Sequence, residues 1–450
     1  MKTPIYDFVS KYSESRTLRL HMPGHKGRAF LGCENLDITE IRGADELYEP
    51  CGIIEQSQNN ASELFGTRAT FYSAEGSSLC IRAMLYLAAQ RRKIKTERPV
   101  FAALSGAHKV FMLACAVLDA EVLFLNHDGE ESGIFGNGLS AENLEKQLES
   151  SPENLCAVYI TSPDYLGHVC DIAHFKKVCE KKHVPLIVDN AHGTYLKFLP
   201  GGSMHPIDLG ADMCCDSAHK TLPVLTGGAY LHISLGSVWD FEKDASEALS
   251  VFGSTSPSYL ILSSLDLANR YIAENIRGDA AKIVTAVSKL KQNIKTLGFD
   301  EVSEEPLKVT IAPKSFGYTG DGIAKILRDN AIEPEFSDPD YVVLMFSPLS
   351  DISDADKVLG VLSSLQKREA LTDSAPQIIH GKRAMSIRRA LFSQKEQISA
   401  KDTQGRILSS PCVGCPPAVP IAVCGETITQ SVIRAFEYYG IEKISVVKND

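Results

Sequence analysis

The strongest constraint on the fold is a regular alternation of short apolar runs and amphipathic segments in the first half of the chain. Apolar runs at 99–104, 121–125 and 156–161 are each followed by a segment in which apolar residues recur at helical spacing. Runs of this length without polar alternation are typical of strands that are buried on both faces of a parallel sheet. The amphipathic segments supply the crossover helices that parallel strands require. The first half is therefore expected to form an α/β domain.

The remaining elements continue this rhythm and then change it near Gly298, which is placed to end a long helix. Before it, further strands are expected at 69–72, 185–189 and 213–216, and helices at 79–88, 108–118, 141–149, 171–182, 258–272 and 279–296. After it, strands are expected at 308–312, 341–346, 421–424 and 441–447, and helices at 320–330, 354–366 and 429–439. We therefore expect a large domain at 1–297 and a smaller α+β region at 298–450, with a linker near 370–377.

Composition narrows the class of protein. The 450 residues are 44% hydrophobic and 23% charged, as in soluble globular proteins, which excludes a disordered chain, a collagen-like fibre and a coiled coil. A formal net charge of −10 argues against nucleic acid as a partner. No apolar stretch approaches membrane-spanning length, and residues 1–20 lack the apolar core of a secretory signal.

The twelve cysteines are too sparse for a disulfide scaffold. Four lie in apolar runs where buried, reduced thiols are expected: Cys80, Cys115, Cys156 and Cys179. Cys412 and Cys415 form a lone C-x-x-C, which is weak support for zinc without a second pair, so no metal is expected. These features predict a reduced, cytoplasmic protein.

The segment from Asp216 to Leu222 carries the most informative chemistry, because it places Ser217, His219 and Lys220 directly after an apolar strand. A lysine at the end of a core strand is unusual, since burying an ammonium group is costly. A desolvated lysine is a nucleophilic amine, suited to a Schiff base with an aldehyde cofactor. The flanking serine and histidine are placed to contact an anion. The alternative is a surface lysine on a loop.

Three other segments fit such a cofactor, each with a structural alternative. Asp189 ends an apolar strand, at the edge where sites gather in parallel sheets, and an acid there can hold a protonated pyridine nitrogen or cap a turn. Gly76-Ser77-Ser78, between a strand and a helix, offers hydroxyl and free N–H groups to a phosphate or is an ordinary helix cap. His108 can stack on a flat heteroaromatic ring or cap a helix.

With these segments in this order, the sequence resembles the Orn/Lys/Arg decarboxylases, which are pyridoxal-phosphate (PLP) enzymes of the aspartate aminotransferase fold, fold type I. The resemblance covers nearly the whole chain. It is carried by His21-Met22-Pro23-Gly24-His25-Lys26-Gly27, Gly43-Ala44-Asp45-Glu46-Leu47, Ser217 to Leu222, and Cys415-Pro416-Pro417-Ala418-Val419-Pro420 with Gly425-Glu426. It implies a large PLP-binding domain with a mainly parallel sheet and a smaller α+β C-terminal domain. The longer members' N-terminal wing domain is not expected, because the first motif begins at His21.

The resemblance also implies the reaction, α-decarboxylation of arginine, lysine or ornithine to an amine and CO₂, with a role in polyamine biosynthesis. Lys220 would form the Schiff base, Asp189 would pair with the pyridinium nitrogen, and His108 would stack on the ring. The other implied cofactor-binding residues are Gly76, Ser77, Ser78, Ala191, His192, Ser217 and His219. Lys220 or His219 would return a proton to the α-carbon. Glu426 would pair with the distal cation of the substrate, and His25 would lie near the interface of a homodimer.

Several positions depart from the family pattern. Asn190 stands where Glu or Ser is common, Val110 replaces a Ser, and Glu75 replaces the Asn before the phosphate cradle. Cys415, Ala418 and Cys424 stand at Tyr, Gly and Pro positions. An acid beside a phosphate is electrostatically unfavourable. Two alternatives therefore stay open: another fold type I reaction, such as aminotransfer or another lyase reaction, and a PLP-binding paralogue with little activity.

Overall fold

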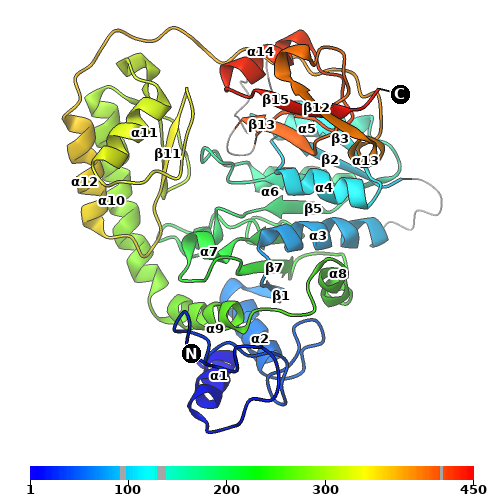
Figure 1. The fold of residues 1–450 in the computed structure, drawn as a ribbon, viewed down its shortest axis with the longest axis vertical. Coiled ribbons are helices and arrows are strands. Elements are labelled where there is room, and N and C mark those ends of the chain that lie inside the picture. The colour runs from blue at the N-terminus through cyan, green and yellow to red at the C-terminus, as the bar shows by residue number, and fades with distance from the viewer. Residues whose placement is uncertain (92–97, 105, 127, 129–137, 416–418, 450) are drawn as a thin grey trace. The chain divides into compact units, whose positions relative to one another are not determined.

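The computed structural model describes residues 1–91, 98–104, 106–126, 128, 138–415 and 419–449 (Figure 1). The chain forms two compact units. The first unit comprises Met1–Arg91, Pro185–Ala281 and Ser347–Leu349, and the second comprises Arg92–Val184, Lys282–Phe346 and Ser350–Asp450.

The first unit is built on strands β1 (Thr67–Ser73), β7 (Ala229–Ser234), β6 (Met213–Asp216) and β5 (Leu186–Asp189), which are neighbours in that order. Strands β5 and β6 run parallel, whereas β7 is antiparallel to both β1 and β6. Both parallel strands are buried along their whole length. Their carboxyl ends therefore meet at one edge, where polar side chains can gather.

Helices complete the first unit. They are α1 (Pro4–Glu14), α2 (Ile53–Phe65), α3 (Ser77–Arg91), α7 (Ala218–Thr221), α8 (Ala245–Phe252) and α9 (Tyr259–Glu274), with the 3₁₀ turn η1 (Thr194–Phe198). In Figure 1, α1, α2 and α9 lie together beyond β1. A core of large apolar side chains joins these helices to the sheet, including Phe65, Tyr72, Tyr230 and Tyr259.

The second unit begins with parallel strands β4 (Leu155–Thr161), β2 (Val100–Leu104) and β3 (Glu121–Leu125). Helices α4 (Lys109–Val117) and α5 (Ala141–Glu149) connect them, and α6 (Ile172–Lys181) follows β4. An antiparallel sheet follows, formed by β10 (Phe336–Ser337), β11 (Val342–Met345), β9 (Lys308–Ala312) and β8 (Asp300–Glu301), with η2 (Pro313–Phe316), α11 (Gly320–Asp329) and α12 (Ile352–Ser363).

The C-terminal part of the second unit contains two strand pairs and two helices. The strands are β12 (Lys395–Ser399) with β15 (Lys443–Val447), and β13 (Cys412–Cys415) with β14 (Val419–Val423). The helices are α13 (Ile387–Phe392) and α14 (Gln430–Tyr438), and η3 (Ala400–Asp402) is a short 3₁₀ turn. Helix α13 packs on α4, where Arg388 donates to the carbonyl oxygens of Ala116 and Val117.

The expected α/β class with parallel strands is confirmed, and most expected elements lie within two residues of the observed ones. Helix α10 (Ile276–Leu297) ends at the predicted stop, Gly298, which adopts φ +97°. The predicted domain boundary after residue 297 coincides with the end of this helix, and residues 370–377 contain neither helix nor strand. The division into two domains at that boundary stays a prediction. The elements that were not predicted are helices α1, α2, α7, α8 and α13 and strands β7, β8, β10, β12 and β13.

Two further expectations concern cysteines and membranes. The eleven cysteines whose side chains are described are all free, and Cys80, Cys115, Cys156 and Cys179 are buried as predicted. Burial raises the pKa of the Cys424 thiol to about 12, so this cysteine is an inert packing group. No helix in the described part of the chain is long and apolar enough to cross a membrane.

Candidate active site

The site is built at the edge where β5 and β6 end. Asp189, the last residue of β5, is 2% exposed, and its Oδ1 accepts a hydrogen bond from the backbone N–H of Ala191 at 3.1 Å. The thiol of Cys215 in β6 also faces this oxygen, at 3.7 Å. Because Asp189 pairs with Cys215 in the parallel ladder, the two segments singled out in the sequence end at the same edge.

The lysine lies in the short helix α7, which follows β6 directly. Lys220 is half-buried, and its Nζ lies 2.9 Å from Nε2 of His192. His192 belongs to the turn after β5, which is closed by a 2.8 Å hydrogen bond from Gly193 N–H to the carbonyl oxygen of Asn190. The structure therefore brings the amine and an imidazole together beside β5, and the alternative of a freely exposed surface lysine does not describe it.

A phosphate cradle lies at the start of α3. Gly76 adopts φ +71°, which favours glycine, and its N–H donates to the carbonyl oxygen of Gly227 at 2.7 Å. Helix α3 begins at Ser77, whose Oγ accepts a hydrogen bond from Ser217 Oγ at 2.8 Å. Two hydroxyl groups from different loops thus converge at the positive end of a 15-residue helix, as an anion site requires.

The unusual acid next to this cradle, Glu75, is bonded to a different loop. The Oε1 atom of Glu75 accepts a hydrogen bond from the backbone N–H of Ser254 at 2.6 Å, in the loop between α8 and α9. Glu75 is exposed, so its charge is also well solvated. Because the Glu75 carboxylate is solvated and bonded to Ser254, we expect its charge to have little effect on a phosphate bound at Ser77.

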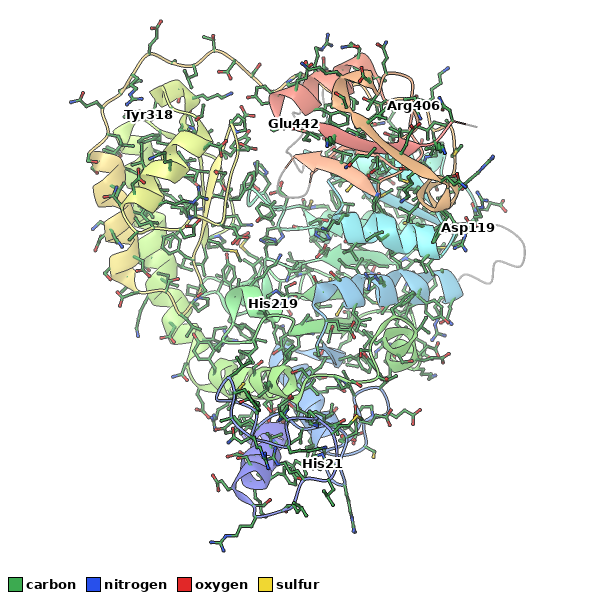
Figure 2. The ribbon with its side chains drawn as sticks, viewed as in Figure 1. His21, Asp119, His219, Tyr318, Arg406 and Glu442 are labelled. Carbon is green, nitrogen blue, oxygen red and sulfur yellow. The ribbon has the colours of Figure 1, made fainter. Side chains whose placement is uncertain are left out.

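His219 enters the site as a neutral imidazole. Burial lowers its pKa, although a hydrogen bond to the Gly228 carbonyl oxygen opposes this effect. Since a carbonyl oxygen only accepts, Nδ1 of His219 carries the hydrogen and donates to Gly228 at 2.9 Å. Its Nε2 then holds a lone pair, so this residue is a proton acceptor in the unprotonated state. Figure 2 labels its position on α7.

These groups fit PLP. A buried carboxylate suits a pyridinium nitrogen, a lysine amine suits the aldehyde, and a helix N-terminus with Ser77, Ser78 and Ser217 nearby suits the phosphate. All lie within the first unit, together with Ala191, His192 and His219. These members of the sequence-based set thus lie in one unit, around the end of β5 and β6 and the start of α3, while the assignment of individual roles stays a prediction.

His108 and Glu426 belong to the second unit. His108 caps α4, where its Nδ1 accepts the backbone N–H of Val110 at 3.3 Å. Glu426 is 8% exposed, and its Oε2 lies 3.3 Å from Nδ1 of His380 and accepts the N–H of Val423 at 3.4 Å. Of the divergent motif before it, residues 416–418, including Ala418, lie outside the described residues, as does the side chain of Cys415.

The N-terminal motif belongs to the first unit, as do His219 and Lys220. Figure 2 shows His21 well separated from His219. His25 is held by Asp37, whose Oδ2 lies 3.2 Å from its Nε2. The second motif has a structural role, because Asp45 accepts the backbone N–H of Ile54 at 2.9 Å and so caps α2. The substrate role of His25 stays a prediction.

One group of residues was missed by the sequence analysis. His205, Asp216 and His232 are fully buried and form the one cluster of possible metal-ligand side chains found within the described residues. Asp216 immediately precedes the lysine motif, and this adjacency was the available signal. The two histidines carried none, because they come from a loop and from β7.

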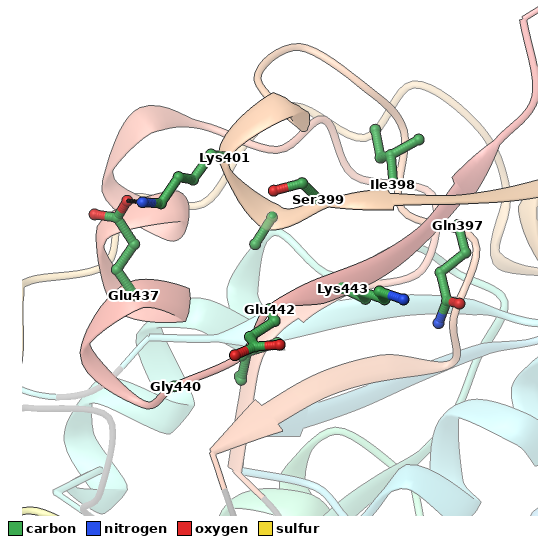
Figure 3. A pocket seen from close by; sticks show the side chains of 10 residues that line it. Gln397, Ile398, Ser399, Lys401, Glu437, Gly440, Glu442 and Lys443 are labelled. Atoms are coloured by element: carbon green, nitrogen blue, oxygen red, sulfur yellow. Dashed lines mark ion pairs between the residues drawn. The ribbon is translucent and has the colours of Figure 1, made fainter.

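A separate groove of about 870 Å³ lies in the C-terminal part of the second unit (Figure 3). It is lined by β12, the start of β15 and the end of α14, and contains an ion pair at 4.0 Å between Lys401 and Glu437. None of the predicted site residues lines it.

Comparisons with known proteins find similarity to basic amino acid decarboxylases. A family model described as Orn/Lys/Arg decarboxylase, major domain, matches residues 3–304. An arginine decarboxylase of Bacillus subtilis (strain 168) is 29% identical, with 96% of this chain and 92% of the relative covered. An arginine decarboxylase of Halalkalibacterium halodurans is 28% identical, with the same coverage.

Solved structures support the fold. The lysine decarboxylase LdcF of Francisella novicida superposes with a TM-score of 0.78 at 16% identity, over 99% of this chain and 81% of that one. The constitutive lysine decarboxylase of E. coli gives 0.76 at 17% identity, over 99% and 82%. At such identities these likenesses bear on the fold alone.

Proposed function

Because its residues 3–304 match the major domain, the chain belongs to the Orn/Lys/Arg decarboxylase family, and on this premise we propose that it converts arginine to agmatine and CO₂. The protein is a PLP-dependent decarboxylase of fold type I that acts on a basic amino acid. The choice of arginine rests on the arginine decarboxylases that align with 96% of this chain. Lysine and ornithine are the competing substrates.

The observation that carries the site assignment is the approach of Lys220 Nζ to Nε2 of His192, 2.9 Å away, in the turn that follows Asp189. PLP, when bound through its aldehyde to a lysine, supplies an electron sink for the charge left by loss of CO₂. We assign the covalent link to Lys220, the pyridinium partner to Asp189, the phosphate to Ser77, Ser78 and Ser217, and ring stacking to His108. A carboxylate opposite the ring nitrogen stabilises its protonated form.

The proton that replaces CO₂ comes from Lys220 in this proposal. His219 has a lowered pKa and uses its Nδ1–H on Gly228, so at neutral pH it offers a lone pair rather than a proton. His192 lies within hydrogen-bond distance of the amine and is placed to exchange a proton with it. His219 and His192 thus act beside the lysine as partners in proton exchange.

The distal group of the substrate is assigned to Glu426. A guanidinium pairs best with a carboxylate that can accept two parallel hydrogen bonds. Glu426 has little exposed surface and is held by His380 and the Val423 N–H, so it is pre-oriented. Glu426→Gln is expected to raise KM for arginine more than it lowers kcat, whereas substrates shortened at the distal end should show little difference between the two enzymes.

A homodimer is part of the proposal. Five large apolar side chains on the N-terminal arm are 68–91% exposed: Leu18, Leu20, Met22, Phe30 and Leu31. Exposed apolar clusters of this kind mark protein interfaces. We propose that a second copy covers them, in a cytoplasmic enzyme that serves polyamine biosynthesis. The free cysteines agree with a reducing compartment.

The test is a substrate panel of arginine, lysine and ornithine with PLP-loaded enzyme, read by mass spectrometry. Agmatine should be the dominant product, and Lys220→Ala should abolish both product and the visible absorbance of bound PLP. Cadaverine or putrescine as the main product would reassign the substrate. A keto acid without CO₂ would instead indicate aminotransfer, and amine formation by Lys220→Ala would contradict the lysine assignment.

A further inference from the structure

A carboxylate without solvent contact lies beneath the proposed site. Asp216, His205 and His232 are all 0% exposed. The Oδ2 atom of Asp216 lies 3.0 Å from Nε2 of His205 and 3.4 Å from Nε2 of His232. Its Oδ1 accepts a 2.7 Å hydrogen bond from the side-chain amide of Asn190. Buried charges persist in proteins only when they are paired in this way.

The position of the hydrogen on the His205 ring follows from the hydrogen bond that its other ring nitrogen makes. The backbone N–H of Ile207 donates to Nδ1 of His205 at 3.4 Å, so the hydrogen of the neutral His205 ring lies on Nε2 and is donated to Asp216. Nδ1 of His232 bonds to the Thr70 hydroxyl at 2.8 Å. Burial alone would raise the pKa of Asp216, but His205 and His232 together hold it below its ordinary value, so the group is a carboxylate.

The same three side chains resemble the donor set of a metal site, but the hydrogens favour a different role. A metal takes the lone pair of a neutral imidazole nitrogen. In His205 the Nε2 atom that faces Asp216 carries the hydrogen, because the other nitrogen accepts from Ile207. Asp216 is therefore an acceptor for two donors, the Nε2–H of His205 and the side-chain amide of Asn190.

Asp216 stands at the junction of the two loops that carry the site. Along the chain it is followed by Ser217 and, in α7, by Lys220. Through space it holds Asn190, whose carbonyl oxygen closes the turn that contains His192. The turn packs tightly on this amide, since a Cβ added to Gly193 would lie 2.1 Å from Asn190 Oδ1.

We propose that Asp216 is a positioning residue, which fixes the β5 turn bearing His192 against the α7 turn bearing Lys220. This rests on the proposed function, because it assumes that Lys220 links PLP. A rigid supporting shell matters since small displacements of reacting groups reduce catalysis strongly. The pair Asn190 and Asp216 supplies this shell here, at a position where Asn190 departs from the family pattern.

The test compares Asp216→Asn with Asp212→Asn. In Asp216→Asn the new side chain has a single oxygen, which His205 requires as its acceptor. Its amide nitrogen then faces the amide nitrogen of Asn190, so two donors meet without an acceptor. Rotating the Asn190 amide by 180° would pair these two side chains but would bury an unpaired N–H on the other side of Asn190. Asp212 is equally buried, immediately before β6, where it accepts from Leu186 N–H and Ser237 Oγ. It is thus a matched control for loss of a buried carboxylate away from the turns.

The readouts are the PLP dissociation constant, the pH titration of the visible absorbance of bound PLP, and the unfolding midpoint. We expect Asp216→Asn to weaken PLP binding about tenfold or more and to shift the pH titration, with Asp212→Asn affecting only the unfolding midpoint. The double variant Asn190→Asp with Asp216→Asn restores one donor–acceptor pair and the net charge, so it should recover PLP binding to within about threefold of wild type.

Equal effects of Asp216→Asn and Asp212→Asn on PLP, or no recovery in the double variant, would overturn the proposal. So would stoichiometric zinc in the purified holoenzyme that is lost in Asp216→Asn. If Asp216→Asn does not fold, His205→Leu removes one donor from the same carboxylate and carries the same comparison. Failure of the lysine assignment is distinguishable, because the visible absorbance of wild type would then persist in Lys220→Ala.

Discussion

At the scale of single residues, the hydrogen bond of Glu75 bears on whether this acid, which replaces an Asn of the family pattern, weakens phosphate binding. Glu75 is exposed, and its carboxylate accepts the Ser254 N–H in the loop between α8 and α9. Glu75→Gln should therefore change the PLP dissociation constant by less than about threefold, since solvent-exposed charges contribute little. Ser77→Ala, measured beside it by absorbance titration, should weaken PLP binding several-fold more. A large gain in PLP affinity in Glu75→Gln would show that its charge does oppose the phosphate.

The individual residues also show where sequence reasoning ends. Asp189 and Lys220 could be selected because each follows an apolar strand, and parallel strands end at a common edge. His205 and His232 could not, because their roles depend on contacts with Asp216 that only the folded chain creates. His25 is the converse case, where a motif is evident but its place is separate from the lysine.

At the scale of elements, a buried acid secures α1. Asp266 in α9 accepts the backbone N–H groups of Ile5 and Tyr6 at 2.9 and 3.0 Å, and the Ser57 hydroxyl at 2.5 Å. Burial raises its pKa to about 6 from the ordinary 3.8, despite these hydrogen bonds. Because the folded-state pKa is the higher one, the folded state is favoured at low pH, and this contribution is lost as pH rises through about 6.

Asp266→Asn should remove this pH dependence. Between pH 4 and 7, the free energy of unfolding of wild type should fall relative to that of the variant by about 3 kcal/mol at most. Urea unfolding at four pH values in this range measures the difference. Parallel pH profiles for the two proteins would mean that the carboxyl is not perturbed. Glu247, exposed on α8 and absent from the contacts of Asp266, is a control position whose Gln variant should keep the wild-type profile.

Elements with a single local signal were predictable, and elements defined by their neighbours were not. Strand β6 and helix α5 coincide with their expected ranges. An unbroken apolar run indicates a buried strand, and an amphipathic repeat indicates a helix, so each pattern was compatible with one type of element. Strand β7 was missed because its buried run contains His232 and follows a glycine pair. Its identity comes from pairing with β1 on one side and β6 on the other, which are far away in sequence.

At the scale of the whole molecule, the separation of the N-terminal motif from Lys220 predicts a site shared between two subunits. The exposed apolar arm, from Leu18 to Leu31, is the surface that a second copy would cover in the proposed dimer. In that arrangement, His25 of one subunit would serve the lysine of the other. If each site takes His25 from one subunit and Lys220 from the other, a variant that lacks His25 and a variant that lacks Lys220 should regain activity when their subunits are mixed.

Mixing Lys220→Ala with His25→Ala under conditions that exchange subunits tests this directly. Random pairing makes half of the dimers mixed, and each mixed dimer holds one site with both native residues, so activity should recover to about a quarter of wild type. Mixing Lys220→Ala with Asp189→Ala is the control. Both residues lie in the same unit of one chain, so every site in a mixed dimer keeps one defect and no activity should return. Recovery in neither mixture would place His25 outside the shared site, and recovery in both would show that the two variants are not fully inactive.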